Sequence, residues 1–513
     1  MPPQGILVIA ACLPAHWEIR FVDENIEPAR PADMAWADAV LISGMHIQRD
    51  CIDDINARAH AAGKLTVLGG PSVSASPEYY PDVDILHLGE LGDATERIIE
   101  RLEVSIRRPA AQEVYSTVER TPLENFPIPA YHLFDMRHYL LASIQYSSGC
   151  PFTCEFCDIP ELYGRNPRLK TPEQVLRELD AIVDAGVVSA VYFVDDNFVA
   201  NPRAARELLP HLVRWQKERG YPVLFTCEAT LNMAQMPDLL EQMREAAFHT
   251  VFFGIETPEP DALVSMDKSH NQRLPLLEAV ETFNRHGIEV VSGIIMGLDT
   301  DHERTGADIL DFIREAQIPM LTFNLLYALP KTPLHRRLRA DNRLLGDEES
   351  RGRVSNVEFK MPYEQVVRMW YETITEAYDP ENLLARCLHQ IEATYPNRYP
   401  IERKVTMAHL RHGLGVMARI LWHVGLRSSW KRAFWKVAWP LLRQGNIEPL
   451  IDLTIICHHL ITFTEDIKSG WHEACFYADP AKNTKDATGA LSGTPQAQNA
   501  LEQEASRGTG TVT

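Results

Sequence analysis

Three closely spaced cysteines carry the strongest chemical signal in this chain of 513 residues. Cys150, Cys154 and Cys157 form a C-x3-C-x2-C run. Three thiolates on one short loop can hold three irons of a [4Fe–4S] cluster, because cluster irons prefer soft sulfur ligands. The run supplies no fourth ligand, so one iron would stay open to a substrate or cosubstrate. Phe156, beside the third cysteine, would shield the cluster from water.

Two other interpretations of these cysteines are a zinc site and three buried free thiols. A structural zinc site usually has four ligands in two pairs, and no second C-x2-C occurs in the sequence. The spacing and position therefore favour the open cluster. The other six cysteines are isolated, and each is expected to be a small buried apolar residue: Cys12, Cys51, Cys227, Cys387, Cys457 and Cys475.

The segment 136–340 must position the cysteines, which directly follow its first apolar run. Six βα units of this size predict a partial (β/α)6 barrel, whose chemistry lies at the C-terminal ends of the strands. The expected strands cover residues 143–149, 190–197, 223–230, 250–257, 289–297 and 320–330. Helices are expected to start near Thr171, Pro202, Met236, Leu274 and His302.

Residues 1–110 show a shorter alternation, with strand-like runs at 17–26, 39–44, 65–70 and 83–89. This pattern predicts a Rossmann-like, flavodoxin-like domain with a parallel sheet covered on both faces. The chain starts inside what would be the first helix, so we expect either a missing strand or a true start upstream. Gly-rich connections follow the last two runs, where open α/β sheets bind ligands. Their candidate binding residues are Gly69, Gly70, Ser72, Gly89 and Glu90.

The formal net charge is −20, from 50 Lys plus Arg and 70 Asp plus Glu. So acidic a chain is a poor candidate for nucleic-acid binding, which needs a positive surface. No stretch approaches the roughly 18 to 20 uninterrupted apolar residues of a membrane-spanning helix. The N-terminus also lacks the basic segment of a signal peptide. We therefore expect a cytoplasmic protein, in which clustered cysteines bind metal rather than form disulfides.

The remaining segments are a Pro-rich linker at 111–135, a helical region at 341–478 and a disordered tail at 479–513, which is poor in apolar residues.

Residues 396–445 hold ten Lys or Arg and one acidic residue, with Trp422, Trp430, Trp435 and Trp439 among them. Tryptophans mixed with basic residues suit the headgroup level of an anionic membrane. The alternative is a helical cap with a solvated charged face. The local charge favours peripheral contact with the inner face of the membrane.

The cysteine spacing at this place in a partial barrel resembles the radical S-adenosylmethionine (SAM) superfamily. The resemblance implies that the open iron binds the amino and carboxylate groups of SAM. One electron from an external reductant would then break the sulfonium C–S bond and release a 5′-deoxyadenosyl radical. Such a radical takes hydrogen from an unactivated carbon, which acid–base chemistry cannot reach.

The same resemblance implies that motifs at the later strand ends contact SAM. The candidates are Asp196, Glu228 and Glu256, with Gly297 in a segment similar to the family's glycine-containing adenine contact. Two plainer interpretations stay open. An acidic residue at a strand end often caps the next helix, and a glycine there can serve close packing alone.

The N-terminal region, with LGGPSVSASPE and VDILHLGELGD, resembles the cobalamin-binding domain of one radical SAM subgroup. The D-x-H-x-x-G motif is absent, so cobalamin would be bound without a lower axial histidine. A flavodoxin-like domain that has lost its ligand is the alternative.

The phrases GCPFTCEFCDIPELYGR, FVDDNF, GIETPE and GLDTD are similar to the hopanoid C-2 methylase group, and the similarity extends to about residue 478. It implies a methyltransferase that moves a methyl group from methylcobalamin to an unactivated carbon of a hydrophobic polycyclic lipid. Two alternatives stay open: a radical SAM enzyme that modifies another lipid or natural product, and an iron–sulfur electron carrier.

Overall fold

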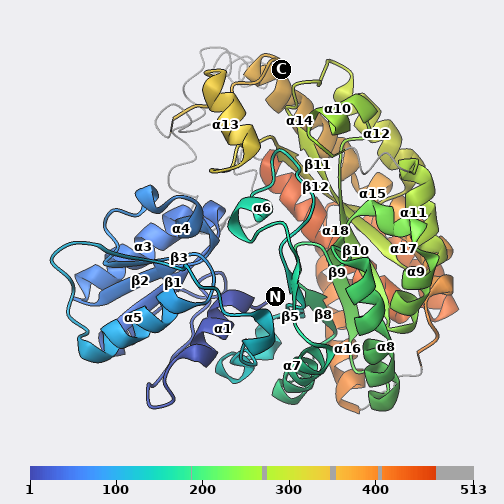
Figure 1. Cartoon of the computed structure of the whole chain (residues 1–513). Helices are drawn as coiled ribbons and strands as arrows, with labels where there is room; N and C mark the ends of the chain where they lie inside the picture. The colour runs from blue at the N-terminus through green and yellow to red at the C-terminus, as the bar shows by residue number, and fades with distance from the viewer. Residues whose placement is uncertain (187, 269–273, 347–353, 402–406, 469–513) are drawn as a thin grey trace, which may run out of the picture.

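The computed structural model contains two parallel β-sheets followed by a group of helices (Figure 1). This α/β architecture with a helical C-terminal region confirms the predicted fold class. The predicted disordered tail, 479–513, lies outside the described residues. The structure describes residues 1–186, 188–268, 274–346, 354–401 and 407–468, and for 407–412 the backbone alone.

A four-stranded parallel sheet forms the N-terminal part, with its strands in sequence order. The strands are β1 (Ala39–Ser43), β2 (Leu65–Gly69), β3 (Ile85–Leu88) and β4 (Glu113–Ser116). The helices are α2 (Pro31–Trp36), α3 (Arg49–Ala61), α4 (Pro71–Ala75) and α5 (Asp93–Val104). Leu68 of β2 packs with Ile52 of α3, whereas Val67 packs with Ile98 of α5. Because neighbouring strand residues point to opposite faces, both faces of the sheet are covered.

The structure differs from the sequence analysis at two places in this part. The run 17–26 is not a strand, because the Asp23 carboxylate accepts the Asn25 N–H and its carbonyl accepts the Ile26 N–H, which makes a turn. The predicted linker, 111–135, begins with strand β4 at the edge of the sheet. Only four residues long and alternately exposed, β4 carries little of the apolar pattern that marks a strand.

A six-stranded parallel sheet forms the central partial barrel, in the order β12-β11-β10-β9-β8-β5. Its strands are β5 (Leu141–Ile144), β8 (Ala190–Phe193), β9 (Leu224–Ala229), β10 (Phe248–Glu256), β11 (Glu289–Met296) and β12 (Met320–Leu325). Its helices are α6 (Ile159–Leu162), α7 (Pro172–Ala185), α8 (Pro202–Arg219), α9 (Pro237–Glu245), α10 (Pro260–Ser265), α11 (Leu276–Arg285), α12 (Thr305–Ala316) and α13 (Pro333–Ala340). A short antiparallel pair, β6 (Ser147–Ser148) and β7 (Arg168–Leu169), lies at its mouth. Since all six barrel strands are parallel, their C-terminal ends meet at one edge.

Side-chain caps followed by proline set where the barrel helices begin. Thr171 accepts a hydrogen bond from the N–H of Gln174, and Pro172 is the first residue of α7. Asn201 and Pro202 begin α8 in the same way. A cap satisfies an N–H that the helix itself leaves free, and the fixed φ of proline suits the first turn. The helix starts expected near Thr171 and Pro202 are thus confirmed.

Helix α1 (Gln4–Cys12) packs on the barrel rather than on the first sheet. The Ser143 hydroxyl of β5 donates to the carbonyl of Pro2, and the Gln4 amide donates to the Tyr131 hydroxyl. Leu7 is fully buried within the barrel's core. Figure 1 shows the N-terminus beside β5. The start of the chain therefore packs with the barrel, although the sequence analysis assigned residues 1–110 to the N-terminal domain.

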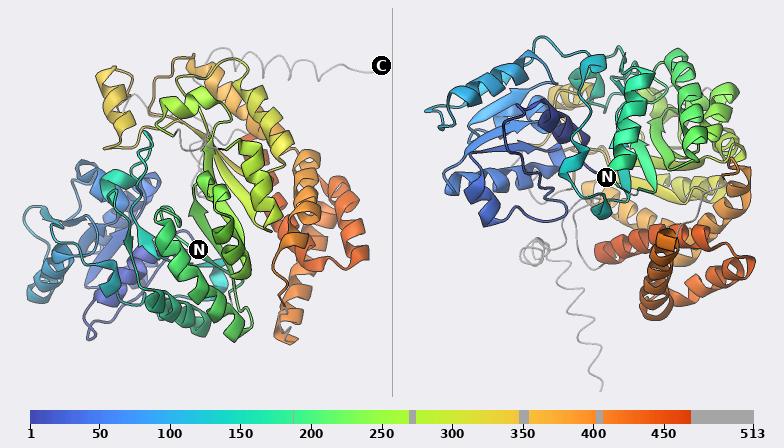
Figure 2. Two further views of the ribbon diagram at one scale, coloured as in Figure 1. Left: turned by 45° about the vertical axis from the view of Figure 1, so that its right-hand side comes forward. Right: turned by 90° about the horizontal axis from the view of Figure 1, so that it is seen from below.

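The helical C-terminal part covers one side of the barrel (Figure 2). It comprises α14 (Tyr363–Ala377), α15 (Pro380–Ala393), α16 (Met407–Ile420), the π-helical segment η9 (Leu421–Arg427), α17 (Lys431–Gln444) and α18 (Ile447–Lys468). Within the described ranges, α18 alone is long and apolar enough to cross a membrane. Its residues Leu450, Leu453 and Leu460 are buried in the core, however, as in the core helix of a folded domain.

A fully buried ion pair lies beneath the mouth of the barrel. Lys170, just after β7, places Nζ 2.6 Å from Glu178 Oε1 of α7, and both side chains are 0% exposed. Burial raises the pKa of Glu178, which shows that the site disfavours an isolated carboxylate.

Lys170→Met should lower the free energy of unfolding by about 3–5 kcal/mol, because it leaves a buried carboxylate without its counter-charge. Denaturant unfolding of the protein without cofactors measures this loss. The double substitution Lys170→Met/Glu178→Leu should recover most of it, since no unpaired charge remains. A single variant as stable as the parent would contradict the argument.

Candidate functional site

The cysteine loop, residues 149–164, leaves the barrel after β5 and returns through β7. Gly149 has φ = +97°, and a Cβ there would lie 2.8 Å from the carbonyl oxygen of Gly164. The N–H of Cys150 donates to that carbonyl at 3.2 Å. Only glycine fits so close a backbone approach at positive φ, so the residue before the first cysteine closes the loop.

Hydrogen bonds from other segments hold the cysteine loop in place. Asp196, at the end of β8, accepts the N–H of Gly149 at 2.7 Å. Between the second and third cysteines, Glu155 donates its N–H to the carbonyl of Met266 and accepts the N–H of Leu334. The loop is therefore bound to the barrel and to the start of α13.

The three thiols of the loop are free and partly buried, and burial raises the pKa of Cys150, Cys154 and Cys157. Metal binding must therefore displace protons from them. Thiolates on a single zinc would lie about 3.8 Å apart. Among the described residues, the one group of three potential ligand atoms within 4.8 Å of one another lies elsewhere, at Glu259, His302 and Asp308. Within the described residues, the three thiols thus do not form so close a group.

A buried cation lies beside the cysteine loop. Lys268 forms an ion pair with Glu256, and its Nζ is 5.4 Å from the centre of the Phe156 ring. Although burial opposes its charge, Glu256 and Cys154 raise the pKa of Lys268. Glu256, predicted as a SAM contact, thus meets this ammonium at the end of β10. The sequence analysis missed Lys268, because it follows α10 in an irregular segment with no motif around it.

Two further predicted acidic residues lie at the ends of β8 and β9. Burial raises the pKa of Asp196 to about 6 and that of Glu228 to about 7. Glu228 accepts a hydrogen bond from the Tyr192 hydroxyl at 3.1 Å. Helix α8 is capped by Asn201, so Asp196 is not the cap that the plainer interpretation allowed. Buried acids whose pKa is raised toward 7 are typical of binding and catalytic sites.

Gly297, at the end of β11, adopts φ = +90°. A Cβ on this residue would lie 2.6 Å from the ring of Phe359. Its N–H donates to Asp301 at 2.6 Å, and burial raises the pKa of Asp301 to about 6. Both the conformation and the close approach require glycine here, so close packing explains this residue as well as a ligand does.

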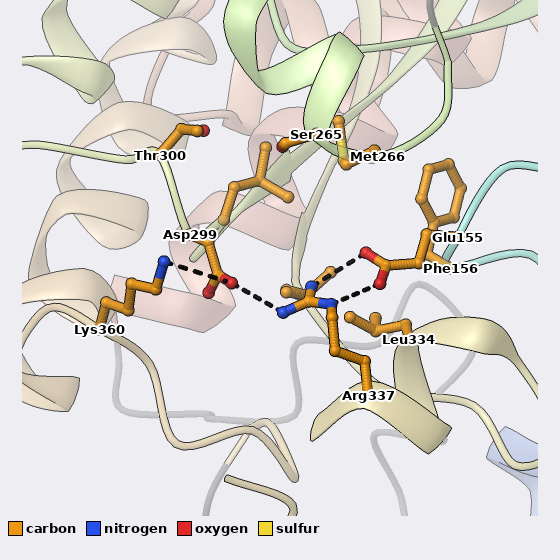
Figure 3. Close-up of a pocket in the computed structure, with 11 residues that line it drawn as sticks. Glu155, Phe156, Ser265, Met266, Asp299, Thr300, Leu334, Arg337 and Lys360 are labelled. Atoms are coloured by element: carbon orange, nitrogen blue, oxygen red, sulfur yellow. Dashed lines mark hydrogen bonds and ion pairs between the residues drawn. The ribbon is translucent and has the colours of Figure 1, made fainter. Parts of the chain in front are cut away.

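A cavity of about 290 Å³ opens beside the cysteine loop (Figure 3). Its apolar wall comes from the loop and from the ends of β11 and β12, and includes Phe156, Leu298 and Leu326. The cavity is also lined by charged residues, namely Glu155, Arg337, Asp299 and Lys360. Such a mixed cavity suits a ligand that has a flat apolar part and polar ends.

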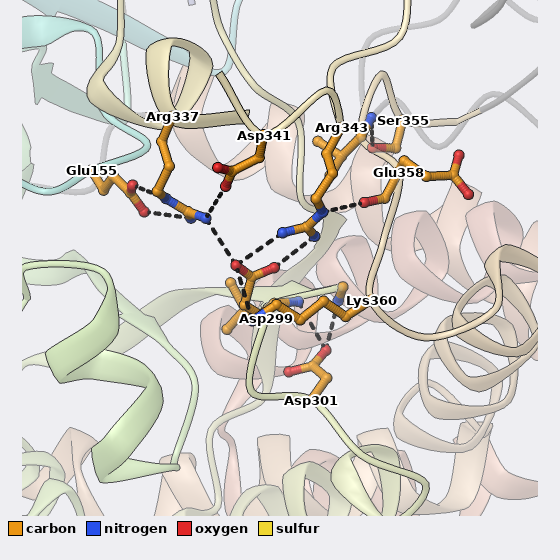
Figure 4. A network of polar contacts seen from close by, with 12 residues as sticks. Glu155, Asp299, Asp301, Arg337, Asp341, Arg343, Ser355, Glu358 and Lys360 are labelled. Atoms are coloured by element: carbon orange, nitrogen blue, oxygen red, sulfur yellow. Dashed lines mark hydrogen bonds and ion pairs between the residues drawn. The ribbon is translucent and has the colours of Figure 1, made fainter. Parts of the chain in front are cut away.

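These charged residues belong to an ion-pair network that reaches the cysteine loop (Figure 4). Arg337 of α13 donates to Glu155 at 2.9 Å and to Asp299 at 2.9 Å. Arg343 pairs with Asp299 at 2.7 Å, and Lys360 Nζ lies 3.6 Å from it. Although burial acts the other way, the hydrogen bonds from Arg343 and Arg337 lower the pKa of Asp299 to about 2. Sequence reasoning missed this network, because its members are scattered over about 200 residues.

The predicted ligand-facing glycines line the C-terminal edge of the N-terminal sheet. Gly69 ends β2, and Gly70 and Gly89 both have φ = +99°. A Cβ on Gly70 would lie 2.6 Å from the Ser43 hydroxyl. Close packing at positive φ therefore requires glycine at Gly70.

Two other residues predicted at this edge turn away from it. The Ser72 hydroxyl is buried and bonds to the Tyr80 hydroxyl at 2.5 Å. Glu90 pairs with Arg168 at 2.7 Å and Arg120 at 2.9 Å. Both side chains therefore serve protein contacts in this structure.

The glycine-lined edge faces the mouth of the barrel. The rings of His46, after β1, and Tyr327, after β12, lie 6.0 Å apart. Lys331 donates to the carbonyl of Ser74 in α4. Figure 1 shows α4 next to α6 of the cysteine loop. Ligands at the sheet edge and at the cysteines would thus face each other.

Comparison with known proteins places the chain in a family. Residues 144–313 match the radical SAM superfamily, and residues 332–473 match a domain of unknown function, DUF4070. Over 93% of its length the chain is 53% identical to hopanoid C-2 methylase of Rhodopseudomonas palustris (strain TIE-1), covering 90% of that protein. It is 34% identical to an uncharacterized methyltransferase of Synechocystis sp., across 91% of this chain and 87% of that one.

A solved structure of the cobalamin-dependent SAM radical enzyme OxsB with aqua-cobalamin bound has the same fold. Its TM-score is 0.53 at 14% identity, over 91% of this chain and 75% of that one. This likeness shows the fold, and the identity to the sequence relatives shows the family. The chain belongs to the radical SAM superfamily and, within it, to the family of hopanoid C-2 methylase.

Proposed function

We propose that this chain is a cobalamin-dependent radical SAM methyltransferase that methylates carbon 2 of a hopanoid. The observation that carries the proposal is the three-thiol loop at the barrel mouth, in a chain 53% identical along 93% of its length to a hopanoid C-2 methylase. A saturated ring carbon has neither an acidic proton nor a lone pair, so a radical route suits this substrate.

The residues that would hold the cofactors lie on two facing surfaces. Cys150, Cys154 and Cys157 would hold the [4Fe–4S] cluster. The backbone at Gly70 and Gly89 would let cobalamin lie close over the sheet edge. When bound and given one electron by an external reductant, the cluster and SAM would supply a radical able to take hydrogen from a saturated carbon. Methylcobalamin would supply the methyl group that replaces the hydrogen.

The chain's own side chains orient and shield this chemistry. The apolar wall of the cavity, with Phe156 and Leu298, suits the adenine ring of SAM and excludes water from the cluster side. Lys268 provides a fixed positive charge next to the thiolates, which offsets part of the negative charge of a thiolate-bound cluster. Glu256 keeps this ammonium in place.

Two alternative functions follow from the same parts. Another lipid or natural product could be the substrate, since the cavity beside the cysteine loop does not itself identify a hopanoid. An electron carrier is disfavoured, because carriers normally fill all four iron positions with protein ligands, whereas the loop offers three thiols.

The reconstituted enzyme, given SAM, methylcobalamin, a reductant and a C-2-unmethylated hopanoid, should form the 2-methyl product together with 5′-deoxyadenosine. Mass spectrometry of lipids and nucleosides measures both. Deoxyadenosine without any methylated hopanoid would move the assignment to another substrate. Absence of deoxyadenosine would favour the electron carrier.

Cys154→Ala should reduce cluster iron to near zero and abolish deoxyadenosine formation, because two thiols cannot replace three cluster ligands. Cys227→Ala is the matched control. Cys227 is also a free thiol, but it lies in β9 outside the cysteine loop and is fully buried. Iron analysis and the visible absorption of the cluster distinguish the two variants. Equal iron content in both would overturn the cluster assignment.

We also propose that the helical hairpin of α16, η9 and α17 contacts an anionic membrane. Trp422 and Trp439 are 51% and 52% exposed, and Leu426 is 58% exposed. Arg427 lies 4.7 Å from the Trp422 ring, and Arg443 lies 4.9 Å from the Trp439 ring. Exposed rings beside guanidinium groups suit the headgroup region of anionic lipid.

Only two of the four tryptophans in this basic window, Trp422 and Trp439, form the exposed surface of the hairpin. The other two tryptophans of the window are structural: Trp430 is buried, and Trp435 donates to the carbonyl of Gly425 and closes the hairpin. Figure 2 shows these helices standing out on one side of the molecule. Peripheral contact there would keep the enzyme at the bilayer, where a polycyclic lipid resides.

Trp422→Ser/Trp439→Ser should weaken binding to phosphatidylglycerol vesicles about tenfold or more, because two large apolar side chains no longer enter the interface. Vesicle co-sedimentation measures binding, and zwitterionic vesicles should bind the parent weakly. Val118→Ser, which changes an apolar residue on the N-terminal part that is 82% exposed, is the control. Unchanged binding by the double variant would rule out this surface.

A further inference from the structure

We propose that Glu90 is a positioning residue that ties the edge of the N-terminal sheet to the cysteine loop and so fixes the two cofactors relative to each other. This inference rests on the proposed function. It replaces the expectation that Glu90 contacts cobalamin, because its carboxylate already serves three donors.

Glu90 reaches across the junction from the end of β3. Its side chain is 12% exposed and pairs with Arg168 at 2.7 Å and Arg120 at 2.9 Å. The Ser148 hydroxyl donates to the same carboxylate at 3.1 Å. Ser148 is two residues before Cys150 in the sequence. A single carboxylate of the N-terminal part thus binds directly at the root of the cysteine loop.

The two arginines extend this contact to the far side of the loop. Arg168 donates to the Ser148 hydroxyl and to the carbonyl of Tyr163. Arg120 donates to the carbonyls of Tyr163 and Leu162, at the end of α6. Glu90 supplies the counter-charge that both guanidinium groups share. Both ends of the cysteine loop are therefore fastened to one group.

Asp196 and Glu90 hold the same stretch of loop from opposite parts of the molecule. Asp196 binds the N–H of Gly149 from the barrel, and Glu90 binds the adjacent Ser148 from the N-terminal part. Charge-assisted bonds in a partly buried site are short and directional. Without the Glu90 contact, Asp196 still holds the loop to the barrel, so the change falls on how the loop is placed relative to the N-terminal part.

The consequence is a specific prediction about coupling. SAM cleavage needs only the cysteine loop and the barrel, whereas methyl transfer also needs the N-terminal edge at the right distance. Loss of the Glu90 contact should therefore leave deoxyadenosine formation nearly intact and lower methyl transfer. A general loss of structure would lower both together.

The experiment compares Glu90→Gln with Lys331→Met in the fully reconstituted enzyme. Lys331→Met is the matched control, because it removes another hydrogen bond between the two parts, to Ser74, that does not touch the cysteine loop. The ratio of deoxyadenosine to methylated hopanoid should rise about tenfold or more in Glu90→Gln and change little in the control, since a misplacement on the order of 1 Å costs up to about 10²-fold in rate.

A second readout does not depend on turnover. Dipolar EPR between cob(II)alamin and the reduced cluster should give one narrow distance distribution in the parent and in Lys331→Met, and a broader one in Glu90→Gln. Ser148→Ala, which keeps all the charges, should broaden it to a smaller degree. Unchanged distributions and ratios in both Glu90→Gln and Ser148→Ala would overturn the inference. A parent that binds both cofactors yet methylates no hopanoid would instead refute the proposed function, with the distance comparison still readable.

Discussion

The site depends on one constraint: three thiols must be held apart on a single loop without a fourth ligand closing around the metal. Contacts of the loop backbone serve this constraint. Gly149 lets the loop close against Gly164, and Asp196 accepts the N–H of Gly149. Glu155 is held through both its N–H and its carbonyl. A loop fastened at its root, middle and end keeps its geometry, so the binding free energy of the metal is not spent on ordering the chain.

Charge balance around the loop follows from burial. Burial raises the pKa of the thiols, and it raises the pKa of the acids at the ends of β8 and β9 to about 6 and 7. Ionising all of these groups together would therefore cost free energy. Lys268 and the Asp299–Arg337 network place fixed cations among them. Arg337 and Lys360 also line the cavity, so the site proposed for a negatively charged cluster has cations beside it for a zwitterionic cosubstrate.

The sequence predicted the parts whose signal is local and missed those that depend on long-range contacts. The barrel strands and the capped helix start at Thr171 are short patterns, and the structure confirms them. The cysteine run is equally local, and its role as the ligand set of a cluster stays a prediction. The bond between Asp196 and Gly149 joins two motifs that were recognised separately. Ser72 and Glu90 were predicted as ligand contacts, and a loop pattern could not show that Ser72 also bonds to Tyr80 or that Glu90 also pairs with Arg168.

The most direct measurement of the three-thiol site is the EPR spectrum of anaerobically reconstituted, chemically reduced protein before and after SAM is added. An iron corner without a protein ligand predicts a reduced [4Fe–4S] signal whose shape changes when SAM binds. Bound zinc, or a cluster signal that is the same with and without SAM, would contradict the account.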